Sequence, residues 1–228
     1  MSAMYSCNAK GLRRSSQNIK DSSMTKRLIN AGVLITLYLV FLAWYDGWGM
    51  SPMTTAEVEQ YLANVPQDSE RVDFLDRMEM LGADDDGEEI FMLNLNRYKY
   101  ADDEPEVGVP AAYRSYGSSV IGMIFKNGGH PIYSAEFFTS RLIDDADEAY
   151  WDEVILVRYR SRRDFLSMVT SDAYQEIARD RTSGIAHAAV SPTTSTVNLA
   201  TPRLWVLIFL LVPGLLFDYL LRRKNTRP

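Results

Sequence analysis

The chain has 228 residues, a formal net charge of −6 and a single cysteine, Cys7. This length allows one domain of roughly 100–150 residues with additional segments. The charge is segregated, because residues 1–27 carry a net charge of +5 and residues 222–228 carry +4, whereas residues 46–202 contain 13 basic and 28 acidic side chains. So acidic a body would repel phosphate groups, which argues against nucleic acid as a partner. One thiol also excludes an internal disulfide.

The N-terminal segment predicts a cytoplasmic tail followed by a membrane anchor. Residues 1–27 are polar and basic with little apolar periodicity, which is typical of disorder. Residues 28–45 carry no charge, and as a helix they would extend about 27 Å, close to the thickness of the hydrocarbon core. Aromatic residues lie at the end of this run, as at a membrane interface: Trp44, Tyr45 and Trp48. A cleaved signal peptide would need a small-x-small site, and the sequence AWYDGWGMS offers none that is convincing.

A second apolar run, residues 204–221, predicts another transmembrane helix. Pro213 and Gly214 lie in its middle and should kink it, which membrane helices tolerate. Asp218 is four residues before Arg222, so we expect these two side chains to pair at the membrane interface. Both basic tails, 1–27 and 222–228, should remain in the cytoplasm, which places the acidic body outside it. In a Gram-negative bacterium that compartment is the periplasm.

Residues 52–86 read as a helical lead-in. Thr54 and Glu57 fit a capping box at the start of a short helix that Pro66 ends. A second amphipathic helix is expected to end at Gly82. The acidic turn at residues 83–87 lacks the ligand spacing of an EF-hand, so we interpret it as a solvated turn and expect no metal there.

Residues 88–199 predict an α+β domain. Strands are expected at 89–98, 130–143, 151–160 and within 185–197. One helix should run from Pro110 to Gly128, and another should begin at a Ser161 cap and end at Gly184, with a break near Thr170 and Ser171. This order, βαββαβ, is that of the ferredoxin-like split βαβ arrangement. Such a sheet has one face covered by helices and one bare face, which favours an identical subunit as partner.

The stretch at residues 151–182, WDEVILVRYRSRRDFLSMVTSDAYQEIARDRT, resembles a family of small uncharacterised proteins in the dimeric α/β-barrel superfamily. The pattern is a strand ending in V-x-x-Y-x-S, a helix with F-x-x-M-V, a Tyr-Gln segment and an Arg-Thr pair. The matching positions are Val154, Val157, Tyr159, Ser161, Arg163, Phe165, Met168, Val169, Tyr174, Gln175, Arg181 and Thr182. Members often carry histidine before the Arg-Thr pair, where this chain has Asp180. The resemblance covers about residues 88–197. It implies a dimer and a lumen between sheet and helices, but no settled reaction.

Polar residues on the expected strands are candidates for lining this lumen. The ligand-binding candidates are Asn94, Arg97, Tyr98, His130, Tyr133, Glu136 and Arg158, and Asn96 and His187 lie on the same strands. His130 is a general-base candidate. Glu136 and Arg158 should form a structural ion pair at the sheet edge. The nearby arginines 160, 162 and 163 are expected to offset acidic charge around the strand-to-helix turn. No phosphate loop, nucleophile elbow or metal-ligand spacing appears, so we expect no cofactor and no metal.

Two functions from different classes remain open. In the first, a dimeric extracytoplasmic domain, held by two membrane helices, binds a small ligand or a membrane protein partner. In the second, the domain is a membrane-tethered enzyme of the isomerase or monooxygenase type that uses the lumen. An apolar lumen or one open to a partner favours the first, and a pocket with convergent His, Glu or Arg groups favours the second.

Overall fold

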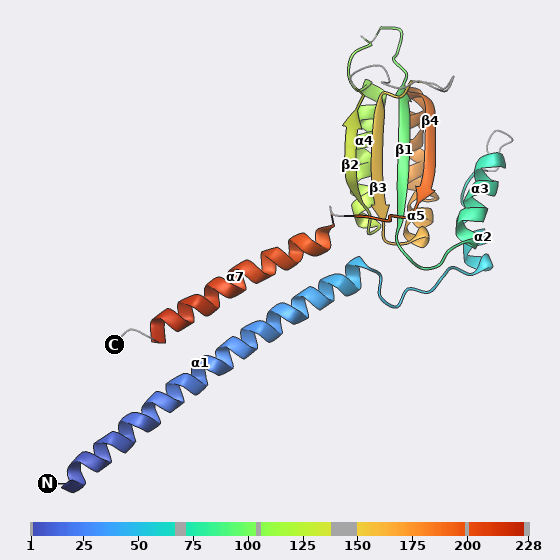
Figure 1. The fold of residues 1–228 in the computed structure, drawn as a ribbon. Coiled ribbons are helices and arrows are strands. Elements are labelled where there is room, and N and C mark those ends of the chain that lie inside the picture. Colours follow the sequence, from blue (N-terminus) through green and yellow to red (C-terminus); the bar gives the residue numbers. More distant parts are fainter. Residues whose placement is uncertain (1, 67–71, 104–105, 138–149, 199–200, 226–228) are drawn as a thin grey trace. The chain divides into compact units, whose positions relative to one another are not determined.

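The computed structural model describes residues 2–66, 72–103, 106–137, 150–198 and 201–225 (Figure 1). The chain divides into two compact units, which we describe separately. The first comprises Met1–Trp44 with Leu199–Pro228, and the second is Tyr45–Asn198.

The first unit consists of two helices, α1 (Ser2–Tyr45) and α7 (Pro202–Asn225). Each contains a 22-residue stretch long and apolar enough to cross a membrane, Met24–Tyr45 in α1 and Pro202–Arg223 in α7. Helix α1 begins at Ser2, so the disordered tail expected for residues 1–27 is helical from residue 2 on. Residues 2–27 contain no proline, and the backbone therefore has no obligatory stop before the apolar run. Helix α7 continues through Pro213.

Polar and close-packed contacts join α1 and α7, which run in opposite directions. Arg27 pairs with Asp218, the Asn30 amide donates to the Gly214 carbonyl at 3.4 Å, and the Tyr38 hydroxyl donates to the Arg203 carbonyl at 3.2 Å. Asp218 also pairs with Arg222 at 2.9 Å, which confirms the expected i, i+4 pair. A Cβ at the buried Gly214 would overlap Leu34. Small residues let membrane helices approach closely in this way.

The second unit is a mixed α+β domain built on one antiparallel four-stranded sheet. Its elements, in chain order, are β1 (Ile90–Tyr98), α4 (Ala111–Lys126), β2 (His130–Glu136), β3 (Glu153–Tyr159), α5 (Arg162–Val169), α6 (Asp172–Gly184) and β4 (Ile185–Thr193). The strands lie in the order β2-β3-β1-β4. The second strand was expected to reach residue 143, but β2 ends at Glu136, and residues 138–149 lie outside the described part of the chain. The expected helix break separates α5 from α6.

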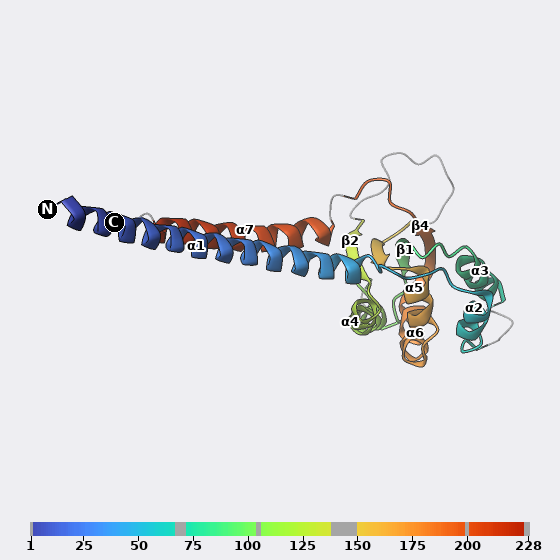
Figure 2. The ribbon, with the colours of Figure 1, turned by 90° about the horizontal axis from the view of Figure 1, so that it is seen from below.

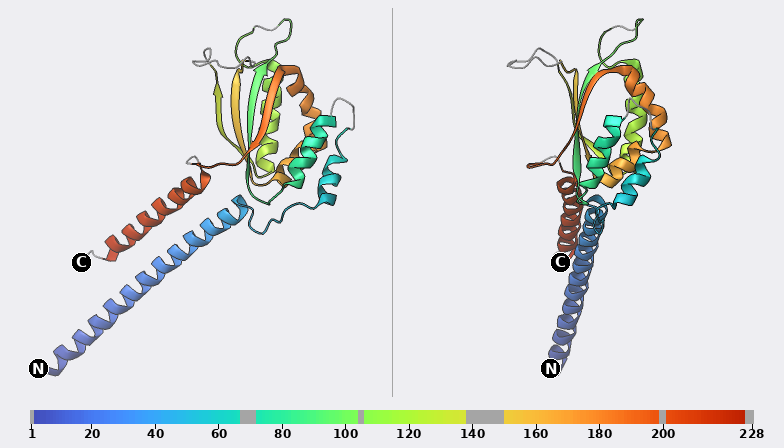
Figure 3. Two further views of the ribbon diagram at one scale, coloured as in Figure 1. Left: turned by 45° about the vertical axis from the view of Figure 1, so that its right-hand side comes forward. Right: turned by 90° about the vertical axis from the view of Figure 1, so that its right-hand side faces the viewer.

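Helices α4, α5 and α6 cover one face of the sheet and leave the other uncovered by helices of this unit (Figures 2 and 3). Alternation along β1 decides which residues face them, because successive strand side chains point to opposite faces. Ile90, Met92 and Tyr98 belong to the core on the helix side. Helix α4 contributes four buried residues at helical spacing, Tyr113, Tyr116, Val120 and Ile124. It ends at Lys126, and Gly128 just beyond the Asn127 cap has a φ of 68°, which suits a residue without Cβ.

The lead-in helices α2 (Thr55–Leu62) and α3 (Val72–Ala83) belong to this unit, and α3 packs against α5. The expected capping box is confirmed, since Thr54 and Glu57 bond each other's backbone N–H groups. A Cβ at the buried Gly82 would lie 2.8 Å from Val58 and 3.2 Å from Leu166, so this glycine allows α2, α3 and α5 to meet.

The arginines of the strand-to-helix turn pair with acidic groups, as expected. Arg163 pairs with Glu57, Arg162 pairs with Asp86, and Arg160 pairs with Asp164 at 2.8 Å. Two of these pairs join α5 to Glu57 on α2 and to Asp86 after α3, and they hold these two parts of the lead-in on the domain.

Candidate functional site

The seven predicted site residues are divided between the two faces of the sheet. Strand register places Asn94, Tyr98 and Glu136 on the helix side. The same register places Arg97, His130, Tyr133 and Arg158 on the opposite side. The predicted set is therefore not one site. It consists of two groups, each of which has different neighbours.

On the side without helices, Arg158 and His130 are cross-strand neighbours beneath Tyr45. Arg158 is fully buried, and its guanidinium carbon lies 3.8 Å from the centre of the Tyr45 ring. Its Nη2 donates to the Tyr45 carbonyl at 2.9 Å, and the Tyr45 hydroxyl lies 2.7 Å from His130 Nε2. These contacts hold the His130 imidazole and the Arg158 guanidinium against Tyr45 within the domain. Arg158 Nη1 is nevertheless buried without a hydrogen-bond partner in the described part of the chain.

The ion pair expected between Glu136 and Arg158 is wrong. Arg158 Nε donates instead to Glu89 Oε2 at 2.7 Å. The reason is the register of β2 and β3, which pairs His130 with Arg158 and Glu136 with Glu153 at the far end of the two strands. Sequence adjacency of the two strands could not show this offset.

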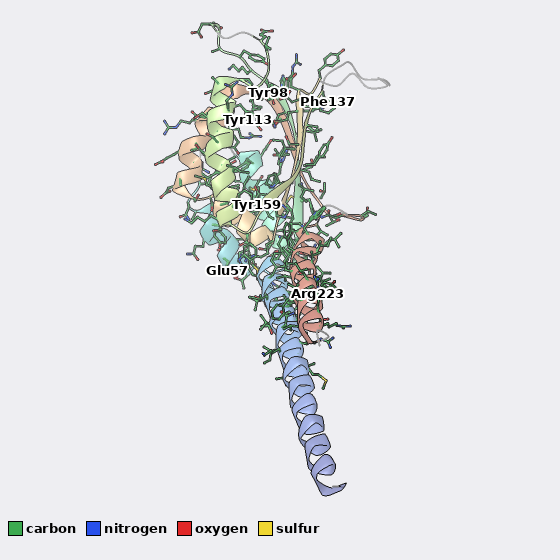
Figure 4. The ribbon with its side chains drawn as sticks, turned by 90° about the vertical axis from the view of Figure 1, so that its left-hand side faces the viewer. Glu57, Tyr98, Tyr113, Phe137, Tyr159 and Arg223 are labelled. Atoms are coloured by element: carbon green, nitrogen blue, oxygen red, sulfur yellow. The ribbon has the colours of Figure 1, made fainter. Side chains whose placement is uncertain are left out.

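The helix side contains a buried polar cluster of four residues, Asn96, Tyr98, Tyr113 and Glu153, which we call the Glu153 cluster. Asn96, only 1% exposed, donates through Nδ2 to Tyr113 Oη at 2.9 Å and to Glu153 Oε2 at 3.2 Å. Glu153 is itself 8% exposed. The Tyr98 and Tyr113 rings lie 5.6 Å apart, on the side of the sheet that α4 covers (Figure 4). Strands β1 and β3 and helix α4 thus converge on one carboxyl group.

Two atoms of the cluster are buried without a hydrogen-bond partner in the described part of the chain, Asn96 Oδ1 and Tyr98 Oη. An unpartnered buried polar atom costs about 1–3 kcal/mol, and native structures contain few of them. Two such atoms beside one buried carboxyl group mark a place where a bound molecule could supply the missing bonds.

Burial sets the protonation of this cluster. Loss of water around Glu153 raises the pKa of its carboxyl group, and the nearby Glu136 raises it further, against the lowering effect of the Asn96 hydrogen bond and of the nearby Tyr113 and Tyr98 hydroxyl groups. Burial also raises the pKa of Tyr98, Tyr113 and Tyr116, so these phenols stay neutral. The hydroxyl of Tyr116 lies 3.3 Å from that of Tyr174, which extends the polar contacts toward α6.

Glu136 and Glu153 face each other directly across β2 and β3, on the helix side. The Cβ atoms of such pairs lie about 4.5–5.5 Å apart, and like charges there are destabilising. Glu136 is exposed and Glu153 is buried. The pair therefore extends from the sheet edge into the Glu153 cluster.

The sequence predicted part of this cluster. Tyr98 was predicted as a site residue and Asn96 was noted on the same strand, and Glu136, which lies opposite Glu153, was also predicted. Glu153 and Tyr113 were not singled out as site residues. The available signal was the alternation Glu153, Ile155, Val157 and Tyr159, in which an acid begins an otherwise apolar face.

Among the described residues, no group of three or more His, Cys, Asp and Glu side chains could hold a metal ion. No family model matches the sequence. No curated protein matches it either. Among solved structures, the chain is similar to RPA0582, a protein of unknown function from Rhodopseudomonas palustris, with 24% identity over 59% of this chain and 97% of that chain and a TM-score of 0.47. A methylated RPA0582 protein gives 24% identity, coverage of 59% and 96%, and a TM-score of 0.46.

Proposed function

We propose that this protein is a membrane-anchored binding protein whose extracytoplasmic domain holds a small molecule at the Glu153 cluster. One observation carries the proposal: Asn96 Oδ1 and Tyr98 Oη are buried and unpartnered next to the buried Glu153 carboxyl group. A fold that retains two such atoms accepts a cost in stability, and local costs of this kind concentrate at functional sites.

The finer fold assignment forms part of this proposal. We assign the domain to the ferredoxin-like split βαβ arrangement and to the dimeric α/β-barrel type. The element order and the antiparallel strand order β2-β3-β1-β4 support the assignment. A second copy would cover the side of the sheet without helices, where Leu93, Leu95, Val154 and Leu156 form an apolar surface. The homodimer thus gives these residues a partner.

The membrane anchoring and its orientation are supported by α1 and α7. Both contain stretches of suitable length and composition, and the basic residues lie at the two ends of the chain. The positive-inside rule then puts both termini in the cytoplasm and Tyr45–Asn198 on the other side of the inner or plasma membrane. A domain held there by two helices is suited to sampling small molecules near the bilayer.

Native mass spectrometry of the full-length protein, purified in detergent from its native membrane, tests the binding function. We expect an additional small mass on the wild type, and at least about tenfold lower occupancy in Tyr98→Phe, because one lost hydrogen bond to a buried ligand can cost about 1.4 kcal/mol or more. Phenylalanine should preserve the fold, since the removed hydroxyl has no partner. Tyr133→Phe is the matched control, because Tyr133 is 56% exposed on the other face. Equal occupancy in both variants would contradict the proposal.

A second candidate function is enzymatic. The raised pKa of the buried Glu153 carboxyl group is the observation that favours it, because a general base or acid works best with a pKa near the working pH. In an isomerisation, the Glu153 carboxylate would take a proton from a carbon next to a carbonyl group and return it to another carbon of the same molecule. Deuterium from the solvent would then enter the captured ligand with the wild type and not with Glu153→Gln. If the wild type caused no exchange, the enzymatic function would be contradicted and only the binding function would remain.

A further inference from the structure

We propose that the molecule bound at the Glu153 cluster is an organic ammonium cation, a primary amine in its protonated form, whose charged group lies between Glu153 and Glu136. The inference rests on the proposed function and adds the chemical class of the ligand. Three independent features of the cluster point to a cation that donates hydrogen bonds: its charge, its free acceptor atoms and its aromatic side chains.

The two acidic side chains of the site have no ion-pair partner in the described part of the chain. They are Glu136 and Glu153, which are directly opposite each other. Asp152 adds a third acid, although its carboxylate accepts the Tyr98 backbone N–H at 2.7 Å. Arg181 on α6 is the basic group that acts on the cluster, through its effect on Tyr113. A cation between the two glutamates would turn a repulsive pair into an attractive arrangement.

The atoms left free by the protein accept hydrogen bonds. Asn96 turns its Nδ2 toward Tyr113 Oη and Glu153 Oε2, and this leaves Asn96 Oδ1 as the free atom. Together with the Glu153 carboxylate and the Tyr98 hydroxyl oxygen, it offers acceptors to a group with several donors. An ammonium group has three N–H donors and no acceptor, whereas a carboxylate or phosphate has the opposite character.

The aromatic side chains of the cluster suit the same ligand. The Tyr98 and Tyr113 rings lie 5.6 Å apart beside the carboxyl group, and the Tyr113 and Tyr116 rings are stacked at 5.7 Å. The electron-rich faces of tyrosine attract ammonium groups by about 0.5–2 kcal/mol each. An anionic ligand would face two glutamates, and a neutral ligand would leave their repulsion in place.

The test uses three molecules with one skeleton: 2-phenylethylamine, 2-phenylethanol and phenylacetate. Each is titrated calorimetrically into the full-length protein in detergent. We expect the amine to bind at least about tenfold more tightly than the alcohol or the acid, a difference of about 1.4 kcal/mol that one buried charge pair can supply. Because burial and Glu136 raise the pKa of Glu153, amine binding should also release protons as the pH falls toward that pKa, and buffers of different ionisation enthalpy reveal this release.

Variants make the result specific to the two glutamates. Glu153→Gln should abolish the proton release and weaken amine binding at least about tenfold, and Glu136→Gln, at an exposed position, should weaken it several-fold. Glu59→Gln removes one exposed acid from α2 and should leave binding unchanged.

The failure of this inference can be told apart from failure of the proposed function. Equal binding of the alcohol, with sensitivity to Tyr98→Phe, would overturn the cation and retain a small-molecule site. Failure of all three molecules to bind, while the native protein still carries a Tyr98-dependent mass, would also overturn the cation alone. Amine binding that Glu153→Gln does not change would overturn it as well.

Discussion

Glu153 brings an ionisable group into a part of the core that tyrosine side chains otherwise fill. Its carboxyl group accepts one hydrogen bond from the Asn96 amide and lies near the Tyr98 and Tyr113 hydroxyl groups, and it forms no ion pair with a basic side chain among the described residues. Burial makes the charged form unfavourable, whereas a cationic ligand would make it favourable. The same residue therefore opposes folding in the free protein and promotes binding in the complex.

This conflict predicts how stability depends on pH. Because burial raises the pKa of Glu153 in the folded protein, the folded state binds its proton more tightly than the unfolded state, where the pKa is about 4.3. The free energy of unfolding should therefore fall as the pH rises from about 4.3 through the folded pKa, and it should change no further from this group above it. Glutamine cannot titrate, so the stability of Glu153→Gln relative to the wild type should grow across that same window.

Thermal unfolding of the full-length protein in detergent at a series of pH values provides the measurement. Glu59→Gln supplies the control, because an exposed acid on α2 should give a difference that does not change in this window. A constant difference between Glu153→Gln and the wild type would show that the Glu153 carboxyl group titrates as it does in the unfolded chain.

For single residues, the sequence predicted which strand side chains are polar, but not which of them lie together in the folded domain. Tyr98 and Glu136 could be selected because both lie on predicted strands and carry side chains that can bind a ligand or transfer a proton. Glu153 was missed because its direction depends on the register of β3 against β1 and β2, which pairs it with Asn96 on one side and Glu136 on the other. Arg158 was assigned the wrong acid for the same reason. Register is a tertiary property, and a single strand does not encode its partners.

Among the elements, the junction of α6 with α4 determines where Tyr113 enters the Glu153 cluster. Gly184 ends α6, and a Cβ there would lie 2.6 Å from the Tyr113 backbone nitrogen and 2.7 Å from Tyr113 Cβ. Its carbonyl also accepts the Lys99 N–H at 3.0 Å, next to the end of β1. Gly184 is thus held between the Tyr113 backbone and the Lys99 N–H group, so a rotamer change cannot make room for an added methyl group.

Gly184→Ala should therefore destabilise the domain by about 1–3 kcal/mol, the usual cost of overpacking, and should weaken ligand binding by moving Tyr113. Gly117→Ala in α4 is the matched control, because a Cβ at Gly117 meets nothing within 4 Å and alanine favours the helix by about 0.5–1 kcal/mol. Chemical denaturation of the two variants measures the difference. Equal stability of Gly184→Ala and Gly117→Ala would contradict this prediction, because it would mean that α6 and α4 can move apart at Gly184 without a loss of free energy of unfolding.

Most elements could be predicted because their boundaries have local chemical causes. Ser161 and Ser171 cap α5 and α6 through their side chains, and Gly128 supplies the positive φ that ends α4. The start of α1 could not be predicted, since a polar segment without proline is compatible with helix or coil. The docking of α2 and of the turn at Asp86 against α5 was also open, because it involves ion pairs between segments far apart in the sequence.

For the whole molecule, charge segregation and two apolar runs predicted two terminal apolar helices and a polar domain between them in the sequence. The pairing of α1 with α7 could not be predicted, because contacts such as Asn30 with Gly214 depend on the rotation of each helix about its axis. The proposed homodimer belongs to the same scale. It requires that a second copy cover the apolar side of the sheet. A charge placed on that side should therefore change the oligomeric state.

Leu156→Asp places a charge in the middle of that apolar surface, where β3 pairs Leu156 with Leu93 on one side and Tyr133 on the other. If the domain dimerises through this surface, burial of the charge should cost several kcal/mol, and the mass of the protein component in detergent should fall from two chains to one. Val190→Asp is the control, because Val190 is 44% exposed on the helix side of edge strand β4. Light scattering coupled to size-exclusion chromatography measures both variants. A wild type that is monomeric at every concentration, or a Leu156→Asp variant that stays dimeric, would show that a second copy does not cover this surface.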